Sequence, residues 1–325
     1  MPDIRVGISG WRYKGWRGNF YPAGLAQKRE LEYASRRFNT LEINGTHYSL
    51  QRPESFRAWY DATPPGFVFA VKAGRYITHY RKLREIEEPM ANFFAQGLLL
   101  LKEKLGPILW QFPQFIPYRP ERFEEFLELL PRTTKEASRL ASRHSPWMKS
   151  RAWTKTDHDR PIRHAVEVRN GDFLVPEFMD LLRRHDVSFV IADTASKWPT
   201  SEDVTASFVY LRLHGSRVLY QSGYTARELD RWAKKVRAWA AGREPAKSRT
   251  VGKSPRAASR DVYVYFDNTD VKLRAPIDAA SFAGRVIPQG QRAPGRSAQS
   301  RRSSAGASGA GTRKPRSRRA VSRRA

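Results

Sequence analysis

Charged residues stand at the ends of several short apolar runs in this sequence of 325 residues. They are Glu42, Lys72, Glu167, Arg169, Asp193, Arg212, His214 and Asp267. Carboxylates and imidazoles transfer protons and bind divalent metal ions, whereas guanidinium and ammonium groups bind phosphate and carboxylate anions. A fold that brings the ends of these runs together would therefore assemble the groups for acid/base or metal-assisted chemistry on a polar substrate.

The apolar runs have the composition of β-strands, because they are short and rich in β-branched and aromatic residues. We expect eight strands, at Arg5–Ile8, Thr40–Ile43, Phe67–Val71, Pro107–Trp110, His164–Val168, Ser188–Ala192, Phe208–Leu213 and Val262–Phe266. Most of them are continuously apolar rather than alternating between polar and apolar residues. This pattern is typical of parallel strands that are covered on both faces.

Segments with helical spacing separate the expected strands. In the last of these, apolar residues recur at helical intervals from Leu229 to Val236, and Thr225 with Glu228 forms a capping box before them. The alternation of strand and helix predicts a single (β/α)8 TIM-type barrel, for which a doubly wound open sheet is the main rival. Only fourteen residues separate Asp193 from Phe208, too few for a standard crossover helix.

A barrel of this type collects its chemistry at the rim formed by the C-terminal ends of the strands. Because strand side chains alternate between two faces, Glu167 and Arg169 project to the same side, and so do Arg212 and His214. The sequence therefore predicts a ring of ionisable groups at one end of the barrel.

Two segments are too basic and too poor in apolar residues to form a core. Residues 285–325 contain twelve Lys and Arg and no acid, and residues 243–260 contain six against Glu244. Such composition does not offset the entropy lost on ordering, so we expect both to be disordered. The predicted organisation is a barrel at 1–284, with a low-complexity basic insertion at 243–260, followed by a tail at 285–325.

The net charge of +27 raises the alternative of nucleic-acid binding or processing. Subtracting the 12 charges of the tail and the 5 of the insertion leaves +10 elsewhere. The long connection from Thr133 to Ile162 has seven Lys and Arg against three acids, together with Trp147 and Trp153. The tail has no aromatic residue on which a base could stack, so it would attract nucleic acid without reading sequence, or serve only to keep the protein soluble.

Several classes are excluded or disfavoured by composition. The chain has no cysteine, which excludes disulfides, thiolate nucleophiles and Cys-ligated metal centres. No apolar run approaches the ~20 residues of a membrane span, and the N-terminus has no secretory signal pattern, so we expect a cytoplasmic protein with no membrane partner. The glycines do not form a phosphate-binding loop, because no Gly-Lys-Ser/Thr follows them.

Five short strings give the chain a resemblance to a known family. They are Gly7-Ile8-Ser9-Gly10-Trp11, Thr40-Leu41-Glu42-Ile43-Asn44, Glu167-Val168-Arg169, Val209-Tyr210-Leu211-Arg212-Leu213-His214-Gly215 and Tyr265-Phe266-Asp267-Asn268. In this order, from about Val6 to about Ala283, they resemble the YecE-like family, called domain of unknown function 72. The resemblance implies a TIM-type barrel and no particular reaction. The chain departs from it at Asp267 and Asp278, where the family has Asn.

One interpretation of the rim is a divalent metal site. Glu167, Asp193, His214 and Asp267 would end four successive strands. Their order resembles the metal site of xylose-isomerase-like barrels, which include sugar isomerases, epimerases and a zinc phosphodiesterase of DNA repair. The resemblance implies Mg²⁺, Mn²⁺ or Zn²⁺ as cofactor, but the rim acids are nearly balanced by Lys72, Arg169 and Arg212, so the cofactor stays unknown at this point.

The preferred interpretation needs no metal. Glu42 and Glu167 would form an acid/base pair, with His214 and Asp193 as a proton relay. Substrate would be bound by Trp11, Tyr13, Asn44, Tyr48, Lys72, Arg169, Arg212, Asp267 and Asn268. The function expected is an enzyme of hydrolase or isomerase type that acts on a small polar substrate, anionic or phosphorylated.

Two other interpretations remain. Lys72 has the residue type for imine formation with a carbonyl group, although a single lysine at a strand end more commonly pairs with an acid. The whole ring has a non-catalytic interpretation as well, as a buried ion-pair network that fixes the strands in register.

Overall fold

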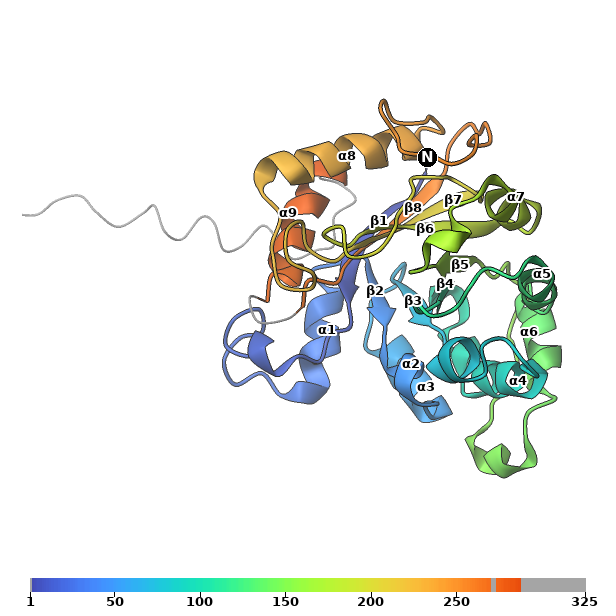
Figure 1. Cartoon of the computed structure of the whole chain (residues 1–325). Helices are drawn as coiled ribbons and strands as arrows, with labels where there is room; N and C mark the ends of the chain where they lie inside the picture. The colour runs from blue at the N-terminus through green and yellow to red at the C-terminus, as the bar shows by residue number, and fades with distance from the viewer. Residues whose placement is uncertain (1, 270–272, 288–325) are drawn as a thin grey trace, which may run out of the picture.

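Eight parallel strands close into a barrel in chain order, with β1 paired to β8 (Figure 1). This computed structural model describes residues 2–269 and 273–287. The strands are β1 (Ile4–Ser9), β2 (Thr40–Ile43), β3 (Val68–Lys72), β4 (Leu105–Gln111), β5 (His164–Glu167), β6 (Val187–Asp193), β7 (Phe208–Leu213) and β8 (Asp261–Phe266). The eight predicted strands and the TIM-type barrel are confirmed, and the open sheet is excluded.

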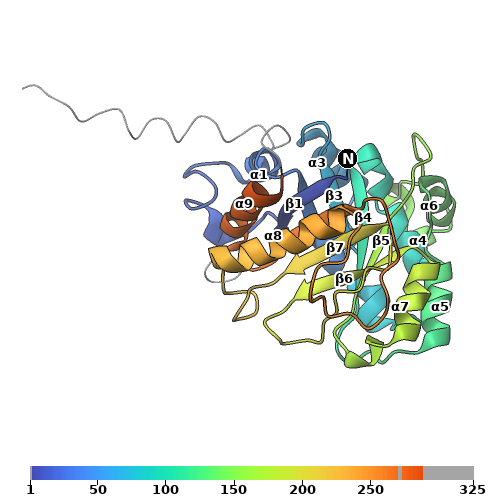
Figure 2. The same ribbon diagram turned by 90° about the horizontal axis from the view of Figure 1, so that it is seen from above.

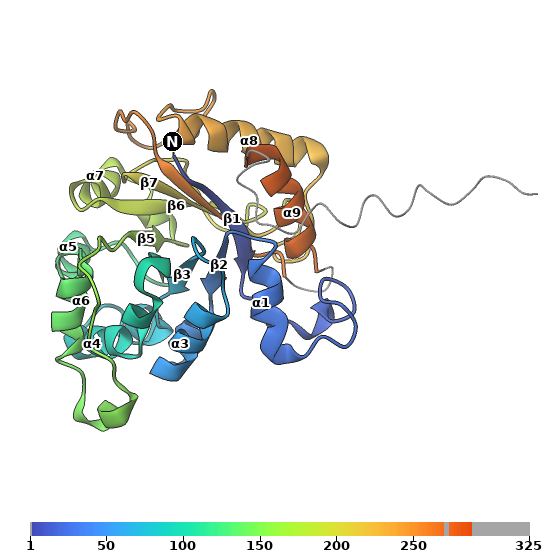
Figure 3. The same cartoon turned by 180° about the vertical axis from the view of Figure 1, so that it is seen from behind.

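Helices cover the outside of the barrel. They are α1 (Glu30–Ser35), α2 (Gly45–Tyr48), α3 (Pro53–Asp61), α4 (Glu87–Ala95), α5 (Pro120–Glu128), α6 (Thr134–Ala141), α7 (Pro176–Arg184), α8 (Ala226–Ala240) and α9 (Ala275–Val286). α9 lies beside α8 and packs on β1 (Figure 2), and α4 packs against α6 (Figure 3). The predicted capping box of Thr225 and Glu228 begins α8, where it bonds the first free N–H groups of the helix.

The apolar core has two parts. A large cluster fills the space between the strands and the helices, and a smaller one fills the barrel interior. Inside the barrel, Tyr210 and Tyr265 face the small residues Ala70 and Ala165, so large rings are accommodated opposite short side chains. On each strand that contributes to it, the last residue of this interior cluster lies two positions before the inward-facing residue at the C-terminal end. Most of those last inward-facing residues are polar.

Two connections depart from a regular barrel. No helix joins β6 to β7, as the short spacing predicted. The long connection from Thr133 to Ile162 carries α6 and a 3-10 segment at Pro146–Arg151, and the Trp153 N–H donates to the Ala95 carbonyl at 2.7 Å. This bond ties the connection back to the end of α4.

The basic insertion follows a defined path between α8 and β8, although its composition predicted disorder. Residues 243–260 contain no helix or strand. The buried carboxylate of Asp203 accepts hydrogen bonds from the backbone N–H groups of Val251, at 2.7 Å, and Gly252, at 2.9 Å. Buried carboxylate oxygens need hydrogen-bond donors, and these two N–H groups of the loop supply them.

The predicted tail begins within α9, and residues 288–325 lie outside the described residues. Within the described ranges, no helix combines the length and the apolar composition that crossing a lipid bilayer requires.

Candidate active site

A layer of inward-facing side chains closes the C-terminal end of the barrel. Each member lies two residues beyond an interior residue of its strand, so the alternation of strand faces points it inward. The layer consists of Ser9, Glu42, Lys72, Gln111, Glu167, Ala192, Arg212 and Asp267. The predicted ring is thus present, with Ala192 rather than Asp193 as the contribution of β6. We call this layer the barrel mouth.

Arg212 from β7 is the centre of a buried ion-pair network. Its Nη1 donates to Glu167 Oε2 at 2.7 Å, and its Nη2 donates to Glu42 Oε1 at 2.8 Å and to Asp267 Oδ2 at 2.9 Å. Its Nε donates to Glu42 Oε2 at 3.1 Å. One guanidinium therefore binds three carboxylates from three different parts of the barrel wall, which is the geometry for which Arg is suited.

Glu42 has both of its oxygens fully engaged in this network. Besides Arg212, Ser9 Oγ donates to Oε1 at 2.5 Å and the Tyr210 hydroxyl donates to Oε2 at 2.6 Å. The side chain is completely buried. This bonding favours a structural role for Glu42, and its predicted function in an acid/base pair stays a prediction without support from the geometry.

Glu167 joins the network to a second arginine. Burial alone would raise the pKa of its carboxyl, but Arg212 and Arg169 hold that pKa well below its usual range. Arg169 Nε donates to Glu167 Oε1 at 3.0 Å, its Nη2 donates to the Tyr220 hydroxyl at 3.0 Å, and its guanidinium lies 3.7 Å over the Trp198 ring. Glu167 therefore stays ionised near neutral pH and is suited to stabilise positive charge rather than to donate a proton.

Lys72 from β3 has a different environment. The side chain is buried, yet its Nζ makes no hydrogen bond and no ion pair within 4.0 Å to any residue that the structure describes. Burial and the neighbouring Arg212 lower its pKa to about 8, against the opposing effect of Glu167, Glu42 and Asp267. The ion-pair partner expected for a single lysine at a strand end is absent from the described residues.

Two imidazoles lie beside Lys72. His47 of α2 has its Nδ1 2.8 Å from the Ala73 carbonyl, and its ring centre is 5.2 Å from that of His79. Burial and Lys72 lower the pKa of His47 to about 3 and that of His79 to about 4, and Arg169 and Arg75 contribute at His79. Both imidazoles are therefore neutral at pH 7. Sequence reasoning did not place either at the site.

His214 and Asp267 form a second pair at the mouth. His214 Nδ1 lies 3.0 Å from Asp267 Oδ2, but the angle does not make a hydrogen bond. The imidazole is fully buried, and neither ring nitrogen has a hydrogen-bond partner within the described part of the chain. Asn44 Oδ1 is likewise buried and unpartnered. These atoms remain able to bond a ligand that enters the mouth.

The family model described as protein of unknown function DUF72 matches residues 5–302. The chain belongs to the DUF72 family. The resemblance to YecE-like proteins is thereby confirmed.

Curated relatives of this DUF72 chain have names without an activity. It is 28% identical over 123 residues to the UPF0759 protein YunF of Bacillus subtilis, an alignment that covers 36% of this chain and 43% of YunF. It is 29% identical over 129 residues to the UPF0759 protein YecE of Escherichia coli K12, covering 39% and 44%. The chain thus matches less than half the length of either relative.

Solved DUF72 structures share the fold. A DUF72 protein of Thermotoga maritima superposes with a TM-score of 0.65 at 24% identity, over 87% of this chain and 98% of that one. A DUF72 protein of Enterococcus faecalis gives a TM-score of 0.61 at 18% identity, over 87% and 95%. Both likenesses confirm the barrel and carry no information on the reaction.

Asp193 of the DUF72 chain lies outside the mouth, contrary to its predicted place in the ring. It shares the outward face of β6 with Phe189 and Ile191, which belong to the outer core. Burial raises the pKa of its carboxyl, and the polar groups of Tyr224 and Trp232 on the helix side partly oppose that shift. His214 is close enough to lower the pKa of Asp193 as well, but no hydrogen bond joins the two side chains in the described structure, so the predicted relay stays a prediction.

The four predicted metal ligands are not brought together. Asp193 faces away, and Glu167 and Asp267 are both bonded to the Arg212 guanidinium, whose charge repels a cation. Within residues 2–269 and 273–287, no three carboxylate or imidazole side chains are grouped so as to hold a metal ion. The donor set of the DUF72 mouth does not fit the divalent cofactor that the sequence raised as an alternative.

The remaining predicted contacts divide between the mouth and the core. The Tyr13 hydroxyl donates to the Ser9 carbonyl at 2.8 Å and therefore lies beside the Arg212 network. Burial, Asp267 and Glu42 raise the pKa of this hydroxyl. Trp11 is buried against Trp59 and is part of the outer core. Asn268 donates to the Asp278 carboxylate at 2.8 Å, so it ties the end of β8 to α9.

Exposed aromatic rings with cations over them adjoin the mouth. Arg75 lies over the rings of Tyr48, at 5.3 Å, and Tyr80, at 5.5 Å, both of which are exposed. Tyr76–Tyr80 is a π-helix, and the segment after it has positive φ at Lys82 (53°) and Leu83 (61°). π-helical turns and strained backbone are both frequent at functional sites. We call residues 74–85 the β3 loop.

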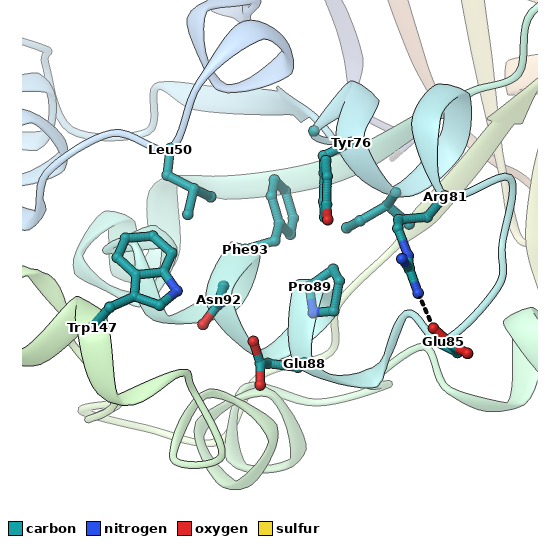
Figure 4. Close-up of a pocket in the computed structure, with 11 residues that line it drawn as sticks. Leu50, Tyr76, Arg81, Glu85, Glu88, Pro89, Asn92, Phe93 and Trp147 are labelled. Atoms are coloured by element: carbon teal, nitrogen blue, oxygen red, sulfur yellow. Dashed lines mark hydrogen bonds and ion pairs between the residues drawn. The ribbon is translucent and has the colours of Figure 1, made fainter.

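A pocket of about 560 Å³ lies between the β3 loop and the long connection (Figure 4). Tyr76 stands on one wall and Trp147 on the opposite one, with Phe93 between them. On the polar side, Glu88 accepts a hydrogen bond from Ser145, and an ion pair joins Arg81 and Glu85. The pocket adjoins the mouth through Gly74, two residues beyond Lys72.

Proposed function

We propose that this DUF72 protein is an enzyme of hydrolase or isomerase type, whose barrel mouth binds a small polar substrate through a phosphate or carboxylate group. The observation that carries the proposal is a group of cations around His79: burial is the largest cause of its lowered pKa, and Lys72, Arg169 and Arg75 lower that pKa further. Among the described residues, neither Lys72 nor Arg75 has a carboxylate within 4.0 Å. Two unpaired cations beside a buried site favour an anionic ligand.

His214 is the group best placed to transfer a proton. Asp267 lies 3.0 Å from its Nδ1, and Arg212 and His214 help to hold the pKa of Asp267 below its ordinary value although burial opposes them. An ionised carboxylate beside an imidazole orients the ring and stabilises it when it takes up a proton. In an isomerisation His214 would accept a proton from carbon, and in a hydrolysis it would accept one from the attacking water.

The anion site is tested by thermal unfolding with inorganic phosphate. Phosphate is expected to raise the Tm of the wild type and of the control Lys28→Met, because Lys28 is exposed and lies in a 3-10 segment that is not part of the mouth. In Lys72→Met and Arg75→Gln the rise is expected to shrink to less than about half. Equal shifts in all four proteins would contradict the proposal.

A role for His214 is tested by turnover on a panel of phosphate esters and phosphorylated sugars. His214→Gln is expected to keep the phosphate-dependent rise in Tm and to lose about 10²-fold or more in kcat, which is typical of a removed general acid/base. Retention of full turnover in this variant would remove His214 from the proposed chemistry.

The second candidate function is binding of single-stranded nucleic acid. It is favoured by the exposed Tyr48 and Tyr80 on either side of Arg75, because bases stack on aromatic faces while cations hold the phosphates. A fluorescent oligonucleotide is expected to bind with steep salt dependence and to lose about tenfold or more in affinity in Tyr80→Ala. Binding that vanishes only when residues 288–325 are deleted would assign it to the tail.

A further inference from the structure

The two buried lysines of the barrel have opposite environments. Lys104 Nζ donates to the carbonyls of Tyr60 and Thr63, each at 2.7 Å, and to Thr63 Oγ1 at 3.2 Å. Its ammonium thus has three acceptors, which is the full complement of its protons. Lys72 is similarly buried and has none among the residues that the structure describes. Lys104 is a structural lysine, whereas the Lys72 ammonium has no bonded partner among the described residues.

The groups that face Lys72 keep its amine from being strongly stabilised as a cation. Arg212 on β7 repels it, and the carboxylates of Glu42, Glu167 and Asp267 are already bonded to that arginine. On its other side lie His47, His79 and Gln111, all of them neutral. With a pKa of about 8, roughly a tenth of the side chain is a free amine at pH 7, compared with less than about one part in a thousand for an ordinary lysine.

We propose that Lys72 Nζ forms an imine with the aldehyde or ketone of an anionic substrate, whose phosphate or carboxylate is held by Arg75 and Arg169. This inference rests on the proposed function and narrows its substrate class to carbonyl compounds. It also assigns the reaction to the isomerase or carbon–carbon bond type rather than to simple hydrolysis.

The step balances without any further reactant. The lone pair of the free Lys72 amine adds to the carbonyl carbon, and one of the two protons on the nitrogen moves to the carbonyl oxygen to give a carbinolamine. The hydroxyl then leaves as water with one proton from the solvent, which replaces the proton that Lys72 released when it became a free amine. The nitrogen keeps its other proton in the resulting iminium ion. The iminium withdraws electrons from the neighbouring carbon, which lets His214 remove a proton there. Nothing is oxidised or reduced.

Reductive trapping tests the proposal directly. The whole protein is incubated with glyoxylate, a small aldehyde that carries a carboxylate, and with cyanoborohydride, which reduces the iminium to a stable secondary amine. Peptide mapping is expected to find the adduct at Lys72, formed about tenfold or more faster than at Lys104 or Lys28, because the neutral fraction of Lys72 is larger. The rate at Lys72 is expected to rise as pH passes through about 8, whereas surface lysines respond nearer their ordinary pKa of about 10.

Two controls separate this inference from the anion site. Lys72→Arg keeps the positive charge and is expected to retain the phosphate-dependent rise in Tm while losing the adduct. If Lys72→Arg does not fold, Lys72→Gln tests the loss of the adduct alone, since it also removes the charge. Propionaldehyde, which has no anionic group, is expected to label Lys72 several-fold more slowly. Labelling spread evenly over the lysines, or unchanged by Lys72→Arg, overturns the imine. If phosphate still stabilises the wild type in that case, the anion site stands alone.

Discussion

On the Arg212 side of the barrel mouth every acid is bonded, whereas on the other side Lys72 and Arg75 have no acidic partner within the described residues. Arg212 satisfies Glu42, Glu167 and Asp267, with further donors from Ser9 and Tyr210. Lys72 faces two neutral imidazoles. The three acids of the mouth are balanced by Lys72 and Arg212 together with Arg169, which lies beside the mouth. The bonding pattern, rather than the charge count, therefore separates the structural side from the functional one.

The largest change in folding stability is expected when Arg212 is removed from the ion-pair network. Arg212→Met leaves three buried carboxylates without their cation, and removal of one partner from a buried ion-pair network costs about 3–5 kcal/mol. Urea denaturation is expected to show this loss, or no folded protein. Arg36→Met, which removes an exposed ion pair with Glu32, is expected to change stability by less than about 1 kcal/mol. A loss of less than about 1 kcal/mol in the free energy of unfolding of Arg212→Met would contradict a structural role for the Arg212 side.

Acid unfolding sharpens the comparison for Glu167. Its folded pKa is lowered by the two arginines, so its stabilising contribution is complete above its unfolded pKa of about 4.3 and is lost as pH falls toward the folded value. Stability of the wild type is expected to drop steeply below about pH 4. Glu167→Gln is expected to lose about 1.5–3 kcal/mol at pH 7 and to fall less steeply in acid. Parallel curves for the two proteins would contradict the assignment.

On the Lys72 side of the mouth, removal of the charged residue is expected to raise stability rather than to lower it. The folded pKa of Lys72 is lowered to about 8 from an unfolded value of about 10.4, so burial of the ammonium destabilises the fold below about pH 8. Lys72→Met is therefore expected to be more stable than the wild type at pH 7, by about 1–2 kcal/mol. The difference is expected to vanish as pH rises from about 8 to about 10. A destabilised Lys72→Met would mean that the amine has a structural partner.

The smallest change in stability is expected for Asp193, which lies outside the mouth. Burial raises the pKa of Asp193, so Asp193→Asn relieves a buried charge and is expected to change stability by less than about 1 kcal/mol. Its response to phosphate is expected to equal that of the wild type. A lost phosphate response in Asp193→Asn would show that the mouth extends to the outer face of β6.

The strands were predictable because continuous apolar runs between helical segments are the pattern of a buried parallel sheet. Which side chains of a strand point into the barrel was predictable only where polar and apolar residues alternate along that strand. In β7, Tyr210, Arg212 and His214 alternate with Val209 and Leu211, and the structure confirms their common inward face. In β6 the only polar residue before Asp193 is Ser188, which lies on the opposite face of the strand, so sequence alone did not show that Asp193 points outward.

The division of the mouth into two sides was not predictable. The bonds of Arg212 cross the barrel, and their pattern depends on closure and on the length of one side chain. The position of His79 depends on the π-helix of the β3 loop, which has no simple sequence rule. The run from Arg75 to Lys82, in which tyrosines and cations are interleaved, is the signal that would have directed attention there.

Arg212 also has a consequence for the order in which the chain folds. It is separated by 170 residues from Glu42, by 45 from Glu167 and by 55 from Asp267. A nascent chain that ends before β7 would bury Glu42 without its bonded counterion and would leave Glu167 with Arg169 alone, so the first five strands gain little from closing together. We therefore expect the N-terminal half to remain open during synthesis until β7 and β8 emerge. Closure of the barrel and neutralisation of its acids then form one cooperative event.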